Sequence, residues 1–390
     1  MENYSQRAIQ LAPDMVRYRR IIHENPEVGG DLPQTTAYVM DQLVQMGYTP
    51  EMVGGGITCT VGNPGKVFLL RADMDALPMT EESGLPFASR IPGAAHCCGH
   101  DLHTAMLLGA AKMLKENEEQ LEGTVKFMFQ PGEEPLVGAR SMIDGGILEN
   151  PKVDAAMAVH VNSMVPAGAV IVFHGPTAAS SDFFTIKVKG KGCHGGRPNE
   201  GIDPISILCH IHTALQELQA RELAAGDIGV MTVGMICGGS AANVIPDTAE
   251  MRGTIRTFDS DIQKRIKERA REISENVAKA FRGEAEVEFA PAYAIPMVCD
   301  EKVAAQVRDG LDSIMRPGQL QYLAKHFPGS EDFSFIANMV PSSFVVIGAA
   351  VGQNVKYGQH HPKVQFNEMC LPIGAAVYAQ AATEWLRSNK

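Results

Sequence analysis

The feature that most constrains the fold is the succession of helical and strand-like segments over the first 178 residues. Apolar side chains recur at helical spacing in one set of segments and form short continuous runs in another. The helical segments are 5–25, 34–47, 104–121 and 138–148, and the strand-like runs are 57–62, 66–76, 123–134 and 153–161. This succession predicts an α/β domain with a mostly parallel sheet and helices on both faces, since parallel strands need crossover helices.

The pattern changes near residue 180 and returns after residue 296. Between these points the expected order is strand, helix, two strands, helix and strand, which is typical of an α+β, ferredoxin-like unit. A helix, a strand and a final helix then restore the α/β pattern. We therefore expect one domain made of residues 1–178 and 292–390, with residues 179–291 inserted into it.

Charge and hydropathy exclude several classes of function. The net charge is −11 and Lys and Arg are scattered, which argues against nucleic-acid binding. No apolar run reaches the ~18 residues that a membrane span requires. The first 20 residues are polar and mixed in charge, unlike a signal peptide. A cytoplasmic protein that binds neither nucleic acid nor membrane is expected.

The eight cysteines are spread along the chain and do not form a disulfide framework. They stand at positions 59, 97, 98, 193, 209, 237, 299 and 370. No C-x-x-C pair occurs, and a bridge between the adjacent Cys97 and Cys98 would be strained. The dense run "HCCGHD" at 96–101 therefore favours a metal site whose other ligands come from distant segments.

Acidic residues and a histidine follow the apolar runs. Asp73 and Asp75 end one run, Glu133 and Glu134 end another, and His160 ends a third. The carboxyl ends of parallel strands meet at one edge of a sheet, so these side chains should converge there. The run 96–101 directly precedes a helix, and we expect it at the same edge of the sheet. The C-terminal loop "YGQHHPKVQF" adds His360 and His361. The five candidate metal ligands are Cys98, His100, Glu134, His160 and His360.

Five protein ligands exceed what one tetrahedral metal with an open position can use, and suit two metals that share a water. Thiolate and imidazole fit zinc and tolerate manganese, nickel or cobalt. Glu133 and Glu134 are adjacent on an extended segment and should point in opposite directions. One can then bind metal while the other acts as a general base.

The order of these motifs resembles peptidase family M20, the aminoacylase and carboxypeptidase family, over nearly the whole chain. The matching stretches are "RADMDALP", "CGHDLHTA", "FQPGEE", "HV", "GGRP", "NVIPDTAEMRGTIRTF", "GSEDFS" and "HHP". They are most similar to the amidohydrolase branch, which includes hippurate hydrolases and plant indoleacetyl-amino-acid hydrolases. The resemblance implies the same five metal ligands, with Glu133 as general acid/base and Asp75 as an orienting carboxylate.

Several neighbouring residues have weaker assignments. His361 is the less favoured histidine of "HHP", since the first one occupies the ligand position of the family motif. His103 is expected to support a ligand rather than bind metal. Cys97 stands where a small residue is usual in this branch, so it either competes for metal or packs. His96 is expected to be a polar loop residue.

The resemblance also gives roles to three residues of the inserted domain. The histidine that matches His194 reaches the active site of a neighbouring subunit in this family and stabilises the oxyanion. Asn243 and Arg256 match positions that hold the substrate carboxylate or the reacting carbonyl. The insertion would then serve as a lid and as the interface of a homodimer. The alternatives are a solvent-exposed turn histidine and an Arg256 in a structural ion pair.

The function implied is a metallo-amidohydrolase that cleaves the amide bond of small N-acyl amino acids, hippurate-like or N-acetylated, with two divalent metal ions. Zinc or manganese is expected, with nickel or cobalt as further options. A dipeptidase or aminoacylase of the same superfamily is one alternative. A non-catalytic metal-binding protein and a structural zinc protein are the others.

Overall fold

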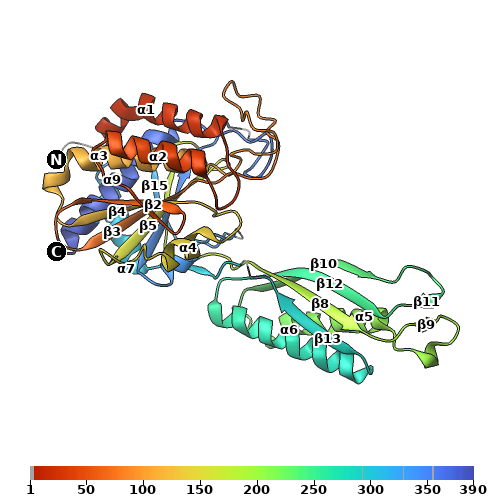
Figure 1. The fold of residues 1–390 in the computed structure, drawn as a ribbon. Helices are drawn as coiled ribbons and strands as arrows, with labels where there is room; N and C mark the ends of the chain where they lie inside the picture. Colours follow the sequence, from red (N-terminus) through yellow and green to blue (C-terminus); the bar gives the residue numbers. More distant parts are fainter. Residues whose placement is uncertain (1–3, 292, 328, 354) are drawn as a thin grey trace. The chain divides into compact units, whose positions relative to one another are not determined.

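The computed structural model describes residues 4–291, 293–327, 329–353 and 355–390. The chain forms two compact units, which Figure 1 shows. Unit 1 runs up to Thr177 and also contains Val298–Lys325 and the residues from Asp332 onward. Unit 2 consists of Ala178–Met297 and His326–Glu331.

Unit 1 is built on an eight-stranded mixed sheet. In spatial order its strands are β1 (Glu51–Val53), β2 (Gly56–Gly62), β4 (Thr124–Gln130), β3 (Val67–Asp73), β5 (Ala155–Asn162), β16 (Ser342–Gly348), β6 (Val170–Phe173) and β15 (Leu320–Leu323). The four central strands β4, β3, β5 and β16 are parallel to one another. The predicted α/β fold with a largely parallel sheet is therefore confirmed.

The margins of this sheet are antiparallel, which the apolar pattern did not reveal. β2 pairs antiparallel with β4 and with β1, and β6 pairs antiparallel with β16. β1, β6 and β15 have three or four residues each, too few for a clear periodic signal. The direction of a strand relative to its neighbour depends on the tertiary fold, so it cannot be predicted from a short apolar run.

Helices cover both faces of the sheet. The helices of unit 1 are α1 (Tyr4–Glu24), α2 (Pro33–Gln45), α3 (His100–Glu116), α4 (Gly138–Asp144), α7 (Glu301–Asp312), α8 (Ser334–Ala337) and α9 (Cys370–Ser388). α3 and α9 pack on β3 and β5, α7 packs on β6 and β16, and α1 lies across α3 and α9. Alternate residues of β3, Phe68, Leu70 and Ala72, point into this core. α4 and α8 pack on β4 and β16, and their buried side chains lie outside it.

The carboxyl ends of β3, β4 and β5 meet at one edge of the sheet. Asp73, the last residue of β3, pairs with Gln130, the last residue of β4. α3 begins at His100, four residues before the helix start predicted at 104. Its N-cap residue is Gly99, whose φ of 108° favours glycine. The polar residues in the first turn concealed this start, because they break the apolar periodicity.

Unit 2 is a four-stranded antiparallel sheet packed on two helices. The sheet order is β10 (Gly229–Gly238), β12 (Thr248–Thr257), β8 (Asp182–Lys189) and β13 (Glu284–Phe289), and the helices are α5 (Pro204–Glu217) and α6 (Ser260–Ala280). Side chains from α5, α6 and all four strands form one core. The chain order β8-α5-β10-β12-α6-β13 is the predicted ferredoxin-like order.

Four short strands complete the fold. β9 (Cys193–His194) pairs with β11 (Val244–Ile245), and β7 (Gly175–Ala178) pairs with β14 (Met297–Cys299). Across the described ranges, no helix has both the length and the apolar character needed to cross a membrane. The cytoplasmic location stays a prediction from sequence.

Candidate metal centre

The five predicted ligands lie together at the carboxyl edge of the large sheet. Cys98, His100 and His160 form one group of possible metal donors, and Cys98, Glu134 and His360 form a second. Within each group the donor atoms are within 4.8 Å of one another. Because both groups contain the Cys98 sulfur, the arrangement has the form of two adjacent sites that share one ligand.

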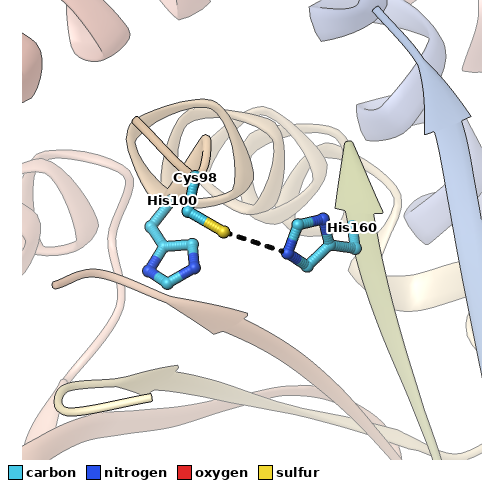
Figure 2. A group of neighbouring side chains, drawn as sticks. All are labelled: Cys98, His100 and His160. Atoms are coloured by element: carbon cyan, nitrogen blue, oxygen red, sulfur yellow. Dashed lines mark hydrogen bonds between the residues drawn. The ribbon is translucent and has the colours of Figure 1, made fainter. Parts of the chain in front are cut away.

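The distances within this cluster suit metal coordination better than direct hydrogen bonding. Figure 2 shows Cys98, in the loop just before α3, and His100, the first residue of α3, near His160 on β5. Cys98 Sγ is 3.6 Å from His160 Nε2. His360 Nε2 is 3.4 Å from the same sulfur and 3.6 Å from Glu134 Oε1. His100 Nε2 lies 3.9 Å from Glu134 Oε1. Ligands about 2.0–2.3 Å from a shared ion are spaced in this way.

Two buried polar atoms of the cluster have no hydrogen-bond partner among the described residues. They are His100 Nε2 and Glu134 Oε1, and both face the other donors. A buried polar atom without a partner costs about 1–3 kcal/mol, so the arrangement is explained if a ligand satisfies both. Thiolate, imidazole and carboxylate donors together fit a divalent transition metal.

Hydrogen bonds behind the two imidazoles direct their other nitrogens into the cluster. His100 Nδ1 donates to the Asp75 carbonyl oxygen at 2.9 Å, which leaves Nε2 on the metal side. His160 Nδ1 donates to the Val161 carbonyl oxygen at 2.6 Å, so its Nε2 faces Cys98. Such partners select the tautomer that can bind metal through the remaining nitrogen.

Asp75 organises the two glutamates through their main chain. Its Oδ1 accepts from the Glu133 amide and its Oδ2 accepts from the Glu134 amide, both at 3.0 Å. The prediction that the two glutamates point in opposite directions is wrong, because residues 133–136 form a turn rather than an extended segment. Glu133 and Glu134 both direct a carboxylate oxygen toward His100 Nε2, each at 3.9 Å. Glu133, predicted to be the general base, therefore lies at the cluster, where it forms a further group of possible donors with His100 and Glu134.

Asp73 and His103 form a second layer behind the cluster. His103 Nδ1 donates to Asp73 Oδ1 at 2.6 Å, and His103 Nε2 accepts from the Val161 amide at 2.8 Å. Both ring nitrogens are occupied, so His103 has none left for a metal. Asp73 Oδ2 also pairs with the buried Arg71 guanidinium at 2.6 Å. Burial alone would raise the pKa of Asp73, but the charge of Arg71 helps to hold it well below its usual value.

The loop that carries His360 is attached to the cluster by its neighbour. Gln359 Nε2 donates to the carbonyl oxygens of Val161 at 3.0 Å and Cys98 at 3.2 Å. His360 has a φ of 64°, an unfavourable conformation for a non-glycine residue that tends to occur at functional sites. His361 turns away, stacks on Tyr357 and lies outside both groups of donors.

The electrostatics of the cluster also favour a bound cation. Burial raises the pKa of Glu134 to about 7 and raises that of the Cys98 thiol well above its usual value. Burial lowers the pKa of His100, but the Asp73 carboxylate and Cys98 outweigh it and raise the value. These raised pKa values favour the protonated forms, whereas a metal binds the carboxylate, the thiolate and the neutral imidazole. A bound cation would stabilise these deprotonated forms.

The two other residues of the 96–98 segment are buried but outside the cluster. Burial raises the pKa of the Cys97 thiol to about 12, and its carbonyl oxygen accepts from the His360 amide at 2.9 Å. His96 is 2% exposed, and neither of its ring nitrogens has a hydrogen-bond partner among the described residues. Neither residue belongs to a described group of possible donors.

Unit 2 brings together two of its three predicted residues. His194 pairs with Val244 in the β9–β11 ladder, and the Gly195 amide donates to the Asn243 carbonyl oxygen at 2.8 Å. His194 Nδ1 accepts from the Gly196 amide at 3.0 Å, so Nε2 carries the proton of the neutral ring. A cavity of about 700 Å³ adjoins this ladder and is lined by Gly195, Val244 and the 238–242 loop.

Arg256 lies apart from this pair. It stands near the end of β12, where the Thr257 carbonyl oxygen accepts from the Ser180 amide. The β9–β11 ladder adjoins the opposite end, since β11 immediately precedes β12 in the chain. A ten-residue strand at ~3.4 Å per residue separates the two ends by roughly 30 Å.

Comparison with known proteins assigns the family. The model of "Peptidase family M20/M25/M40" matches residues 69–384, a span that includes every predicted site residue. The chain belongs to peptidase family M20/M25/M40. The predicted resemblance is thereby confirmed, and the M20 assignment makes the protein a metal-dependent hydrolase.

Individual M20 relatives agree with this assignment. An N-acetylcysteine deacetylase of Bacillus subtilis is 34% identical over 96% of this chain and 98% of its own length. An IAA-amino acid hydrolase (ILR1-like 4) of Arabidopsis thaliana is 38% identical over 96% of this chain and 86% of its own. The crystal structure of a dinuclear metal-binding M20 peptidase of Bacillus subtilis has a TM-score of 0.83 and 31% identity, and covers 97% of this chain and 99% of that one.

Three residues that support the site of this M20 hydrolase were not singled out from the sequence. Gln359 precedes the ligand His360, and its place beside "HHP" was the available signal. Arg71 is fully buried between Asp73 and Asp332, at 2.6 Å and 3.0 Å. Both Arg71 and Asp332 stand inside quoted motifs, but a motif alone does not show that two of its charges are paired across 261 residues.

Proposed function

We propose that the protein is a two-metal amidohydrolase of N-acyl amino acids, with Cys98, His100, Glu134, His160 and His360 as metal ligands. The observation that carries this proposal is the pair of donor groups that share Cys98, with Glu133 beside them. The names of the deacetylase and IAA-amino acid hydrolase relatives support an N-acyl amino acid as substrate. Zinc or manganese suits the mixed sulfur, nitrogen and oxygen donors, and nickel or cobalt can replace them.

Glu133 is the proton carrier of this mechanism. Divalent metal ions held by the five ligands supply Lewis acidity and lower the pKa of water toward neutrality. Glu133 takes a proton from the water that attacks the amide carbonyl and returns it to the leaving amine. Asp75 keeps the Glu133 carboxylate in position through the main-chain amide. Glu133 can carry out both proton transfers from this one position.

Arg256 is the candidate anchor for the substrate carboxylate. Its guanidinium is half-buried and forms no ion pair with a described carboxylate, although Nη1 donates to the Ile255 carbonyl oxygen. Its guanidinium carbon lies 5.7 Å from the centre of the Phe183 ring. An arginine held this way keeps donors available for bidentate carboxylate binding. This supports recognition of a free carboxylate next to the scissile amide.

His194 and Asn243 would act on the reacting carbonyl from a second copy of the chain. His194 Nε2–H is a donor of the kind that stabilises an oxyanion. The roughly 30 Å along β12 between this ladder and Arg256 exceeds the length of an N-acyl amino acid, so one copy cannot supply both ends of the same substrate site. In a dimer with a twofold axis, one copy can supply Arg256 and the other His194 and Asn243 to the same substrate site.

The edge strand β10 supports such a homodimer. It lies at the margin of the unit 2 sheet, and Val230, Met235 and Ile236 are 47%, 39% and 47% exposed. Long apolar edge strands are prone to pair with another chain unless they are covered. Antiparallel pairing of two β10 strands would cover them and give an isologous interface.

A substrate panel tests the proposal. Apo-protein is reloaded separately with zinc, manganese, nickel and cobalt and assayed on N-acetyl, N-benzoyl and indoleacetyl amino acids, with dipeptides as comparison. Amide hydrolysis that requires both metal and a free substrate carboxylate is expected. Preferential cleavage of dipeptides would favour a dipeptidase. Unfolding on chelation would favour a structural zinc protein, since a catalytic site loses activity and keeps its fold.

A further inference from the structure

A buried polar network joins α1 to the first turn of α3, beside the metal cluster. Arg19 and His23 of α1 and Asp101 of α3 are only 1%, 3% and 0% exposed. Arg19 Nε donates to Asp101 Oδ2 at 2.6 Å, and His23 Nδ1 is 2.8 Å from the same oxygen. Charges this deeply buried require close partners, because desolvation costs several kcal/mol for each ion.

Asp101 links this network directly to the proposed ligands. It follows His100 in the first turn of α3, and Cys98 lies three residues before it. No side chain caps the start of this helix, because the N-cap residue is Gly99. Gly99 itself is tightly enclosed, since an added Cβ would lie 2.4 Å from Val161 Cγ2. The Asp101 carboxylate is therefore the polar link between this turn and α1.

The network also holds the loop that leads into the ligand segment. His23 Nε2 is 3.1 Å from Glu81 Oε1, and Glu81 Oε2 accepts from the Ser89 amide at 2.7 Å. The Phe87 ring covers Arg19, with 4.6 Å between the guanidinium carbon and the ring centre, and lies 5.4 Å from the His23 ring. α1 thus contacts both the loop before residue 96 and the helix turn after residue 98.

We propose that Arg19 and His23 are positioning residues that act through Asp101 to hold Cys98 and His100 in metal-binding geometry. This inference rests on the proposed metal site. None of Arg19, His23 and Asp101 is among the site residues predicted from the sequence. The apolar helix faces of α1 and α3 would pack without these charges, so the network contributes geometry that apolar packing alone does not specify.

The decisive variant replaces both charges together. Arg19→Met with Asp101→Leu exchanges a buried ion pair for apolar side chains, which often preserves stability. His23 keeps its contact with Glu81, and Glu368, the second partner of Arg19, keeps its ion pair with Arg20. If the pair only stabilises the fold, metal affinity should stay unchanged once the fold is intact. If it positions ligands, affinity should fall by ~10-fold or more, as for other residues that orient ligands. The matched control is Arg17→Met with Asp14→Leu, an exposed pair at 3.0 Å on the same helix.

Metal affinity is measured on apo-protein by chelator competition with zinc, and ligand geometry by the absorption spectrum of the cobalt form. The double variant is expected to lose affinity and to shift its sulfur-to-cobalt band, while the control matches wild type. Wild-type affinity and spectrum in a folded double variant would overturn the proposal. If that variant does not fold, His23→Gln decides, since it keeps the Arg19–Asp101 pair: unchanged affinity overturns the proposal, and reduced affinity supports it.

His100→Ala separates this inference from the proposed site. If His100→Ala leaves zinc affinity unchanged, the ligand assignment is wrong and the positioning role is wrong with it. If His100→Ala abolishes binding while the Arg19/Asp101 double variant binds normally, the site stands and only the positioning role fails.

Discussion

The carboxylate of Asp75 accepts a hydrogen bond from the backbone amide of Glu133 at 3.0 Å, and its second oxygen does the same for Glu134. One buried side chain thereby fixes the main chain of the residue proposed as general base and of its neighbour, proposed as metal ligand. The link is direct, because no intervening residue transmits it. A change at Asp75 should disturb both proposed functions together.

Asp75→Asn tests this link. The asparagine amide oxygen can accept from only one of the two backbone amides, because its NH₂ group is a donor. We expect kcat to fall by ~10–10² and the free energy of unfolding to drop by about 1–3 kcal/mol. Steady-state kinetics and urea unfolding measure the two effects.

Asp154→Asn is the control for Asp75→Asn. Asp154 Oδ2 also accepts from a backbone amide, that of Val67, at 2.9 Å, but at the amino end of β3. It should lose stability without a change in kcat. Equal kinetic effects in the two variants would show that Asp75 has no special link to the glutamates.

Glu133→Gln and Glu134→Gln should have opposite effects on metal content. Glu133→Gln removes the proposed base and keeps its shape, so kcat should fall by at least ~10² while bound metal stays near the wild-type amount. Glu134→Gln removes a charged ligand and should deplete bound metal. Metal analysis beside kinetics distinguishes them. Metal loss from Glu133→Gln, with activity rescued by excess metal, would mean that the two roles are exchanged.

Cys98→Ala and Cys97→Ala test which sulfur is the ligand. Cys98 belongs to both donor groups, so its removal should lower metal affinity and activity together. Cys97 is buried outside the cluster, and Cys97→Ala should cost only about 1–2 kcal/mol of stability. Chelator competition and thermal unfolding measure these effects. Loss of metal binding in Cys97→Ala alone would show that the ligand loop has a different register.

Much of this site could be anticipated because strand ends are readable from sequence. Glu133, Glu134 and His160 each follow an apolar run, and the parallel pairing of β3, β4 and β5 brings those ends to one edge. The rule that the carboxyl ends of parallel strands meet at one edge is enough for this prediction, and no contact has to be known. It places backbone ends together but does not describe what lies behind each side chain.

The supporting contacts were beyond sequence reasoning for a physical reason. Arg71 pairs with Asp332 across 261 residues, and Arg19 pairs with Asp101 across 82. Such pairs depend on how helices and strands pack, and no local periodicity records them. The antiparallel margins of the sheet were missed on the same ground. His103 was assigned a supporting role from sequence, but its partner Asp73 became visible only in the fold.

Glu81 should make stability depend on pH in the acid range. Burial alone would raise its pKa, but hydrogen bonds and charge from His23, with those from Ser83 and Ser89, hold the pKa at about 2. Its folded pKa is depressed, so its stabilisation is fully present above the unfolded value near 4.5 and is lost as the pH falls toward 2. In metal-free protein, Glu81→Gln should lower the free energy of unfolding by about 2 kcal/mol at pH 7.

This difference between wild type and Glu81→Gln should shrink between pH 4.5 and pH 2. Urea unfolding over the range measures it. Glu82→Gln is the matched control, because the Glu82 side chain is 59% exposed and its ion pair with Lys363 is long, with 3.7 Å between Oε2 and Nζ. A Glu81→Gln difference that stays constant over this pH range would show that the carboxylate is not stabilised as described.

His194→Ala tests the contribution of unit 2 to the reaction. His194 Nε2 carries the proton of the neutral ring, since Nδ1 accepts from the Gly196 amide. If Nε2–H stabilises the oxyanion, kcat should fall by ~10²–10³ with metal content unchanged, as for other removed oxyanion contacts. Near-normal kinetics would leave His194 a turn residue.

Mixed dimers show which copy His194 serves. In a heterodimer of His194→Ala and Glu133→Ala subunits, action in trans places both lesions in one active site and leaves the other intact. About half of the wild-type activity per dimer should then return, although each parent homodimer is inactive. Action in cis leaves one lesion in each site, so a verified heterodimer without recovery would exclude the trans arrangement. Recovery would also require two copies to meet through unit 2, as the separation of His194 from Arg256 along β12 suggests.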